Sequence, residues 1–252
     1  ILVFLFAIPF WILGAVVEPE NLPINLPLST FAVLAPIAAA LILTYRDSGR
    51  ESVYRLLRSA VDYRHIENKV WYLPIFLLMP LIAVLTYILL VALGRSLPTL
   101  QFPIGAAVVM LVVFFIGGIA EELGWQGYLF ERIQLRGNAL EAALIVGVVW
   151  AIWHIIPFIQ THNPPEWIAW QCGFTVGLRV LIVWVYNNTG KSLFAAVSIH
   201  AVYNLSAFLF PNLGSHYDPA TTCLLTFIVV GIAVYFWGAP TLAHWRFAHK
   251  PR

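Results

Sequence analysis

Eight apolar runs, most of them about the twenty residues that a helix needs to cross the hydrocarbon of a bilayer, make up most of this sequence. They cover residues 1–17, 27–45, 70–93, 102–120, 138–158, 168–187, 193–210 and 220–238. Of the 252 residues, 61% are apolar and 10% are charged, whereas about a quarter of a soluble domain is charged. The pattern predicts an all-α, polytopic membrane protein with about eight transmembrane helices, which form a single membrane domain over residues 1–252.

The same composition excludes several other classes of protein. A chain this apolar cannot cover itself with polar surface in water, so soluble, disordered and nucleic-acid-binding proteins are excluded together. The sequence therefore predicts that the protein is embedded in a lipid bilayer. The first run begins at Ile1 without a preceding methionine or basic segment, and we expect a true span with some upstream sequence missing.

Basic residues are distributed unevenly between the two sides of the predicted bundle. Twelve of the 14 Lys and Arg residues fall in same-side segments, while Arg95 lies in an opposite loop and Arg179 lies inside a span. The twelve are Arg46, Arg50, Arg55, Arg58, Arg64, Lys69, Arg132, Arg136, Lys191, Arg246, Lys250 and Arg252. The positive-inside rule predicts that this side and both termini face the cytoplasm, in the cell membrane.

The loop over residues 46–69 has an additional pattern. Val53, Leu56, Leu57 and Ala60 recur at helical spacing among arginines. An amphipathic basic segment of this kind is typical of a helix that lies on anionic lipid. We therefore expect a cytoplasmic interfacial helix over 46–69.

Ionisable side chains are rare within the predicted spans, and most of them lie on three spans. Glu121 and Glu122 follow directly after the apolar run of the fourth span. His154 lies in the fifth span, and His200 and Asn204 lie four residues apart in the seventh. A charged residue at the centre of a membrane helix costs about 2.5–3.5 kcal/mol on insertion scales, so such residues mark functional sites by default. We expect these side chains to share a pocket.

Two adjacent carboxylates at this depth need an explanation of their own. Like charges this close resist joint ionisation, so we expect one of them to be protonated or held by a donor. Gln126, four residues after Glu122 on the same helical face, is the nearest candidate donor. The polar set also fits a purely structural role, since intramembrane His and Asn side chains often only link neighbouring helices.

Three short motifs in this region resemble those of the CPBP family of intramembrane proteases, which includes Rce1-type CAAX prenyl endopeptidases and bacteriocin-processing Abi proteins. The family motifs read Glu-Glu-x-x-x-Arg, Phe-x-x-x-His and His-x-x-x-Asn or Asp, each on its own helix. The matching stretches here are residues 121–126, 150–154 and 200–204. They lie in the family's order within residues 102–210, which the resemblance marks as a protease core.

The sequence departs from these motifs at two positions. Trp150 stands where the family has Phe, and keeps a large aromatic ring. Gln126 stands where the family has Arg, which removes a fixed positive charge beside Glu122. Three outcomes are open: Gln126 supplies a neutral hydrogen bond, Arg179 supplies the charge from another helix, or the site is weakened. Arg179 also fits a structural reading, in which its side chain extends toward the membrane interface.

The resemblance implies an intramembrane endopeptidase that hydrolyses peptide bonds with a glutamate-activated water. Glu121 would be the general base, and His154 would help to orient or deprotonate the water. His200 and Asn204 would donate hydrogen bonds to the oxyanion of the transition state. The residues expected to support this set are Glu122, Gln126 and Trp150. The implied substrates are peptides or proteins that enter at the membrane, either prenylated CAAX tails or bacteriocin and leader peptides.

The same residues also permit a metal site. Glu121, His154 and His200 together would supply three ligands and leave one position for water. The helical His-Glu-x-x-His pattern of zinc proteases is absent from the sequence. We favour chemistry without a metal or another cofactor, and keep the divalent-metal site as the alternative.

Two further classes of function fit the polar cluster. A catalytically silent relative would scaffold membrane partners and use the cluster only to hold helices together, and the missing motif arginine favours this reading. A proton-coupled transporter would use the two glutamates and two histidines as a relay. The sequence shows no internal repeat of the kind found in many transporters, which lowers the transporter reading.

Overall fold

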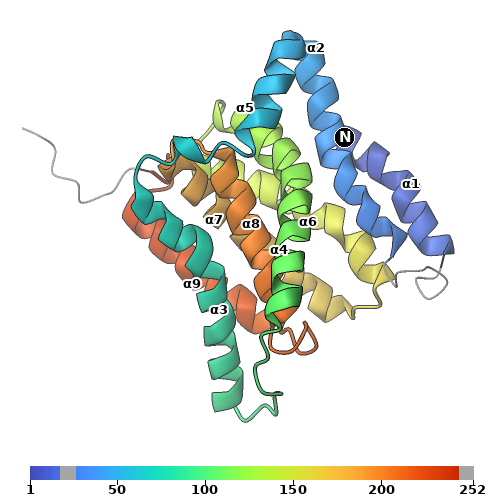
Figure 1. Cartoon of the computed structure of the whole chain (residues 1–252), viewed down its shortest axis with the longest axis vertical. Helices are drawn as coiled ribbons and strands as arrows, with labels where there is room; N and C mark the ends of the chain where they lie inside the picture. Colours follow the sequence, from blue (N-terminus) through green and yellow to red (C-terminus); the bar gives the residue numbers. More distant parts are fainter. Residues whose placement is uncertain (18–26, 244–252) are drawn as a thin grey trace, which may run out of the picture.

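The computed structural model describes residues 1–17 and 27–243, and within these ranges every regular element is a helix. The short helix α5 covers Glu131–Gln134. The eight long helices are α1 (Leu2–Val16), α2 (Leu34–Ser59), α3 (Tyr72–Ala92), α4 (Ile104–Glu122), α6 (Ala139–Gln160), α7 (Pro165–Asn188), α8 (Leu193–Leu209) and α9 (Pro219–Trp237). They form one bundle (Figure 1), so the predicted all-α fold with about eight helices is confirmed.

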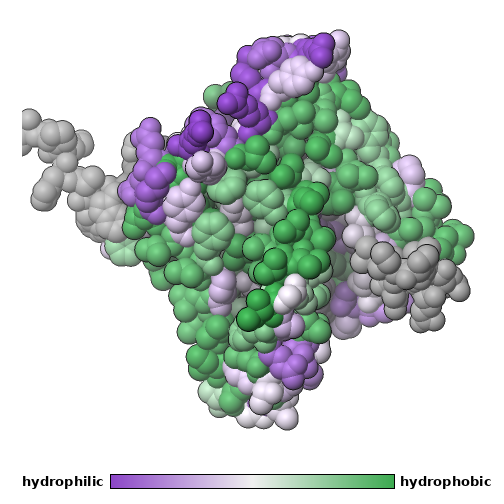
Figure 2. Space-filling model, in the orientation of Figure 1, coloured by the Kyte–Doolittle hydropathy of each residue, from purple (hydrophilic) through white to green (hydrophobic). Residues whose placement is uncertain are grey.

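Most of these helices have the length and surface of membrane spans. Six helices of the described chain are long and apolar enough to cross a bilayer, while α1 and α8 are shorter apolar helices of 15 and 17 residues. Figure 2 shows apolar surface along α3 and α4, with hydrophilic residues gathered toward the ends of the bundle. Large apolar side chains such as Leu77, Val84 and Ile116 are exposed on this surface. The protein is an integral, multi-pass membrane protein.

Helix α7 is the central helix of the bundle. In its most apolar window 67% of the residues are buried, against 39% or less in the other candidate spans. It packs against α6, α8 and α9. Gly147 of α6 permits the closest approach, because a Cβ atom there would lie 3.1 Å from the Cα of Val176 in α7. This packing brings the polar residues of α6 and α7 to the same level.

The basic loops lie at one end of the bundle. Lys191 forms an ion pair with Glu131 at 2.8 Å, and Arg132 forms one with Asp47 at 3.0 Å. These contacts join the basic second part of α2, the segment after α4 and the loop after α7, as the predicted span count requires. Three of the twelve basic residues, Arg246, Lys250 and Arg252, lie outside the described residues. The assignment of this end to the cytoplasm stays a prediction.

The expected interfacial helix over 46–69 differs from the structure. Helix α2 runs on from its apolar part to Ser59, and it bends at Gly49, whose φ of 73° and ψ of −176° are not helical. After Ser59 only two short 3₁₀ turns follow, at Tyr63–His65 and Lys69–Trp71. Glycine tolerates the positive φ that this sharp bend requires. The basic segment is therefore the second arm of a bent helix, and its contact with lipid stays a prediction.

Helix α4 does not stop where the apolar run stops. After Glu122 the chain continues as a π-helical stretch, Leu123–Phe130, and then as α5. The π-helical stretch packs closely against α2: a Cβ atom at Gly124 would lie 2.7 Å from the carbonyl oxygen of Pro36 in α2. The two glutamates thus lie within a continuous helical column, 8% and 0% exposed, and not at a span end.

Candidate active site

The predicted site residues come together around one cavity of about 230 Å³ between α4, α6, α7 and α8. Glu121 reaches it from α4, His154 from α6, and His200 and Asn204 from α8. Trp150 lines the same cavity, one helical turn before His154. The expectation of a shared pocket is therefore confirmed, while the roles of the residues in catalysis stay predictions.

Glu121 is held by the residue that departs from the second motif. The indole Nε1–H of Trp150 donates a hydrogen bond of 2.7 Å to Oε2 of Glu121. A phenylalanine has no such donor, so Trp150 does more than fill the space of the family's aromatic ring. The bond leaves Oε1 of Glu121 as the carboxylate oxygen without a hydrogen bond from the described residues.

His154 is oriented by its own helix. Its Nδ1 lies 2.9 Å from the backbone oxygen of Trp150. Because a carbonyl oxygen only accepts hydrogen bonds, Nδ1 must carry the hydrogen, and in the neutral ring Nε2 holds the lone pair. His154 is half-buried and can accept a hydrogen bond from a water in the cavity.

Glu122 points away from the cavity into a fully buried ion pair. Its two oxygens accept hydrogen bonds of 2.6 and 3.0 Å from Nη1 and Nη2 of Arg179 in α7. The same carboxylate lies 2.8 Å from Nδ1 of His200. Glu122 and Arg179 are each 0% exposed, and a buried charge is tolerated only when it is paired in this way.

Two of the three outcomes that the sequence left open for position 126 are now decided. Arg179 supplies the missing positive charge from another helix, as one of the alternatives stated. Gln126 is not the donor to the acidic pair, and this expectation was wrong: its Oε1 lies 3.5 Å from Nη1 of Arg179, and its Nε2 has no partner among the described residues. The four-residue spacing places Gln126 near Glu122, but it is the guanidinium of Arg179 that donates hydrogen bonds to both carboxylate oxygens of Glu122.

Sequence reasoning missed three polar wall residues, Gln171, Thr175 and Tyr203. Gln171 of α7 donates a hydrogen bond of 2.8 Å to the hydroxyl of Tyr203 in α8, and accepts one of 3.0 Å from Tyr217. Gln171 and Tyr203 both line the cavity. The signal was present, since Gln171 is a polar residue inside an apolar span and Tyr203 lies within the third motif.

The alternative metal set lies in the wall of the same cavity. Glu121, His154 and His200 all line it, but within the described residues no three His, Cys, Asp or Glu side chains are grouped to hold a metal ion. The three-ligand set is therefore not preassembled. We derive no chemical step through a metal.

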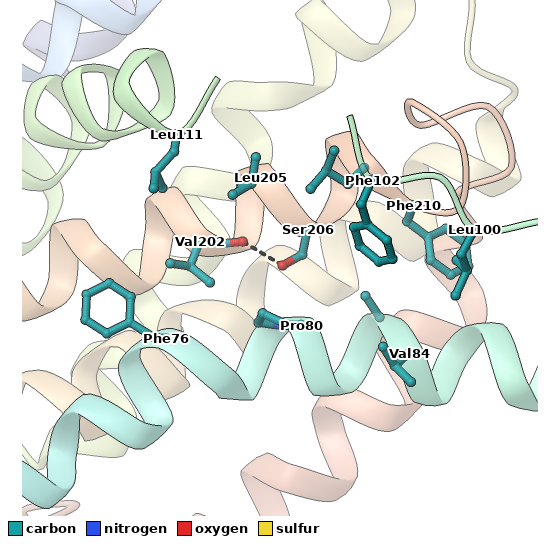
Figure 3. A pocket seen from close by; sticks show the side chains of 12 residues that line it. Phe76, Pro80, Val84, Leu100, Phe102, Leu111, Val202, Leu205, Ser206 and Phe210 are labelled. Atoms are coloured by element: carbon teal, nitrogen blue, oxygen red, sulfur yellow. Dashed lines mark hydrogen bonds between the residues drawn. The ribbon is translucent and has the colours of Figure 1, made fainter. Parts of the chain in front are cut away.

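A second pocket, of about 360 Å³, lies on a different face of α8 (Figure 3). Its walls are apolar residues of α3, α4 and α8, among them Pro80, Leu111 and Leu205. The one hydroxyl in its lining, that of Ser206, donates a 2.7 Å hydrogen bond to the carbonyl oxygen of Val202. The pocket offers no ionisable group, unlike the polar cavity, which is lined by Glu121, His154 and His200.

Comparisons with known proteins agree with the motifs. The model of the family described as "Type II CAAX prenyl endopeptidase Rce1-like" matches residues 103–206. A CAAX prenyl protease 2 from Methanococcus maripaludis is 26% identical over 189 residues, which cover 69% of each chain. Together with the three motifs that meet at one cavity, these matches support membership of the chain in the CPBP family of intramembrane proteases, and the matching sequences are CAAX-type members of it.

Proposed function

We propose that this protein is an endopeptidase that cleaves prenylated CAAX-type proteins, with a water activated by Glu121 and without a metal. The proposal depends on one observation: a carboxylate oxygen and two imidazole nitrogens around a single cavity of the helix bundle have no hydrogen-bond partner among the described residues. The names of the matching family and of the relative support a CAAX-type substrate. Leader peptides are the competing substrate class.

The attacking water is expected to lie between Glu121 and His154. The hydrogen bond from Trp150 occupies Oε2 of Glu121, so Oε1 is the oxygen that takes the proton. The Nε2 lone pair of His154 accepts the second hydrogen of the water and orients it toward the scissile carbonyl. A positioned base of this kind contributes about 10²- to 10⁴-fold to the rate.

The oxyanion is expected to form on the α8 side of the cavity. The amide of Asn204 has no hydrogen-bond partner among the described residues and is free to donate. Nδ1 of His200 donates to Glu122, so His200 also donates from Nε2 only when its ring carries both hydrogens. Donors fixed in advance stabilise a developing charge strongly.

Collapse of the tetrahedral intermediate needs an acid. Protonated Glu121, which holds the proton taken from the water, is placed to return it to the leaving amine. The side chains of Phe114, Phe158 and Leu178 form apolar parts of the wall. Such walls limit the access of bulk water, and hydrogen bonds to the reacting atoms are stronger as a result.

The test uses purified protein in proteoliposomes and three peptides, of which the first two share one sequence. The first ends in a farnesylated cysteine followed by three residues, the second is its unprenylated form, and the third is a bacteriocin-type leader peptide. Glu121→Gln removes the base and keeps the shape of the side chain. Glu131→Gln is the matched control, because Glu131 pairs with Lys191 at the surface of the bundle.

We expect cleavage of the farnesylated peptide by the native protein and by Glu131→Gln, with and without a chelator, and none by Glu121→Gln. Loss of activity with the chelator would overturn the metal-free mechanism. Cleavage of the leader peptide alone would overturn the substrate assignment. Absence of cleavage in every sample would favour the catalytically silent relative.

A further inference from the structure

Arg179 connects both halves of the site without lining the cavity. Its guanidinium binds both oxygens of Glu122, at 2.6 and 3.0 Å. A planar guanidinium that binds a carboxylate through two parallel hydrogen bonds fixes orientation as well as distance. Glu122 therefore has one position and one orientation, although it lies inside an apolar bundle.

The first connection leads from Arg179 to His200. Oε1 of Glu122 accepts from Nη2 of Arg179 and also lies 2.8 Å from Nδ1 of His200. The carboxylate can only accept, so it keeps a hydrogen on Nδ1 and turns Nε2 toward the cavity. Arg179 thus determines, through Glu122, which ring nitrogen of His200 faces the substrate.

The second connection leads from Arg179 to Glu121. Cζ of Arg179 lies 4.2 Å from the ring centroid of Trp150, a cation–π contact. The indole N–H of the same ring donates to Glu121. The contact with Arg179 fixes the plane of the indole, and that plane sets the direction of the hydrogen bond to the base.

The charge next to Glu122 can come from either of two positions. Gln126 lies four residues after Glu122, and its Oε1 is 3.5 Å from Nη1 of Arg179. A guanidinium extending from position 126 would reach the same carboxylate. In this chain the charge is supplied by α7, 53 residues later in the sequence.

We propose that Arg179 is the positioning residue of this site: it takes the place of the arginine missing at position 126, and it holds His200 through Glu122 and Glu121 through Trp150. The proposal rests on the proposed function, since the two residues that it holds are the base and an oxyanion donor. Arg179 does not line the cavity. Its replacement is expected to lower kcat and leave KM unchanged.

The test is a charge swap. Arg179→Gln is expected to lower kcat about 10- to 100-fold, the usual effect of losing a group that orients a reactive side chain. The double variant Gln126→Arg with Arg179→Gln returns a guanidinium to Glu122 and is expected to recover most of that loss. Thr86→Val is the matched control: Thr86 is a buried polar residue of α3 outside the cavity, and its replacement is expected to leave kcat unchanged.

A second measurement does not need a substrate. In protein labelled with ¹⁵N-histidine, the His200 ring signal is assigned by its loss in His200→Gln. We expect a hydrogen-bonded Nδ1–H in the native protein and in the swap, and an altered signal in Arg179→Gln. If the native protein cleaves no peptide, the proposed function fails, while this signal still decides the role of Arg179.

Three results would overturn the inference. The first is folded Arg179→Gln with kcat within twofold of the native value or with an unchanged His200 signal. The second is a folded swap variant that is as inactive as Arg179→Gln. The third result comes from Arg179→Lys, which keeps the charge but not the paired donors. This variant takes the place of Arg179→Gln in the test if Arg179→Gln does not fold. Lower thermal stability of Arg179→Lys with unchanged kcat would show that Arg179 is only structural.

Discussion

At the scale of single residues, the site depends on which hydrogen bonds each buried polar group forms. Trp150 occupies one oxygen of Glu121, and the carbonyl of Trp150 occupies Nδ1 of His154. Glu122 occupies Nδ1 of His200. Each of these contacts leaves one defined atom of a reactive side chain for the cavity. These contacts therefore determine which atoms of Glu121, His154 and His200 face the cavity.

Trp150→Phe tests the contact behind the base. The change keeps an aromatic ring and removes the N–H that donates to Glu121. A hydrogen bond to a charged group contributes about 1.5–3 kcal/mol, so we expect kcat/KM to fall about 10- to 100-fold. Peptide cleavage measures it. Trp153→Phe is the control, because Trp153 is buried on the same helix and its indole N–H has no partner among the described residues. Equal activity of the two variants would contradict a role for the indole N–H.

Asn204→Ala tests the oxyanion donor. Removal of one such donor costs about 10²- to 10³-fold in kcat, and we expect a loss in this range with KM unchanged. Ser206→Ala is the control on the same helix, since the hydroxyl of Ser206 is bonded to the carbonyl oxygen of Val202. Steady-state kinetics separate the two constants. A change confined to KM would assign Asn204 to substrate binding instead.

At the scale of elements, the junction of α4 with the π-helical stretch positions the acidic pair. π-Helical turns are rare, and they often occur at functional sites. Here the stretch Leu123–Phe130 begins directly after Glu122 and packs against α2. The close approach of Gly124 to Pro36 leaves no room for a side chain. The packing of α2 therefore helps to set the height at which Glu121 and Glu122 enter the bundle.

Gly124→Ala is expected to destabilise the protein. The added Cβ would meet the backbone of Pro36, which cannot move as a free side chain can, and overpacking of this kind costs about 1–3 kcal/mol. We expect a lower unfolding temperature in detergent, followed by tryptophan fluorescence, and reduced cleavage. Gly117→Ala on the same helical column is the control, since no atom lies within 4 Å of a Cβ atom there. Equal unfolding temperatures for both variants would show that α2 can yield.

At the scale of the whole molecule, charge and apolar surface define how the bundle lies in the membrane. The ion pairs of Lys191 and Arg132 hold the basic loops at one end. Helix α3 extends away from that end (Figure 1), and Arg95 lies in the loop that follows it. Apolar side chains cover the surface between the two ends (Figure 2). This asymmetry predicts a single orientation, with the basic end in the cytoplasm.

Cysteine labelling in cells and in inverted vesicles checks the orientation. The background replaces Cys172 and Cys223 with alanine, and single cysteines are placed at Ser48 and Ser96, both exposed and at opposite ends of the bundle. We expect an impermeant maleimide to label position 96 in intact cells and position 48 in inverted vesicles. The reverse pattern would place the basic end outside.

The limits of prediction from sequence follow from the range of each interaction. The apolar part of each helix was predicted closely, because the length of an apolar run is a local property. The extent of α2 was not, since Gly49 permits a bend without ending the helix. On the basis of helical spacing Gln126 was the nearest candidate donor to the acidic pair, with Arg179 as an open alternative, and the partner of Glu122 is Arg179, 57 residues away in α7.

The sequence by itself determined that this chain is a bundle of membrane helices and that its few intramembrane polar residues are grouped on particular helices. Hydrophobicity over twenty residues and short motifs carry that information, and both can be recognised without knowing which helices are neighbours. The tertiary structure alone decided which side chain pairs with which. A buried charge must find its partner within a few ångströms, and the packing of α4, α6, α7 and α8 selects Arg179 for Glu122 and Trp150 for Glu121.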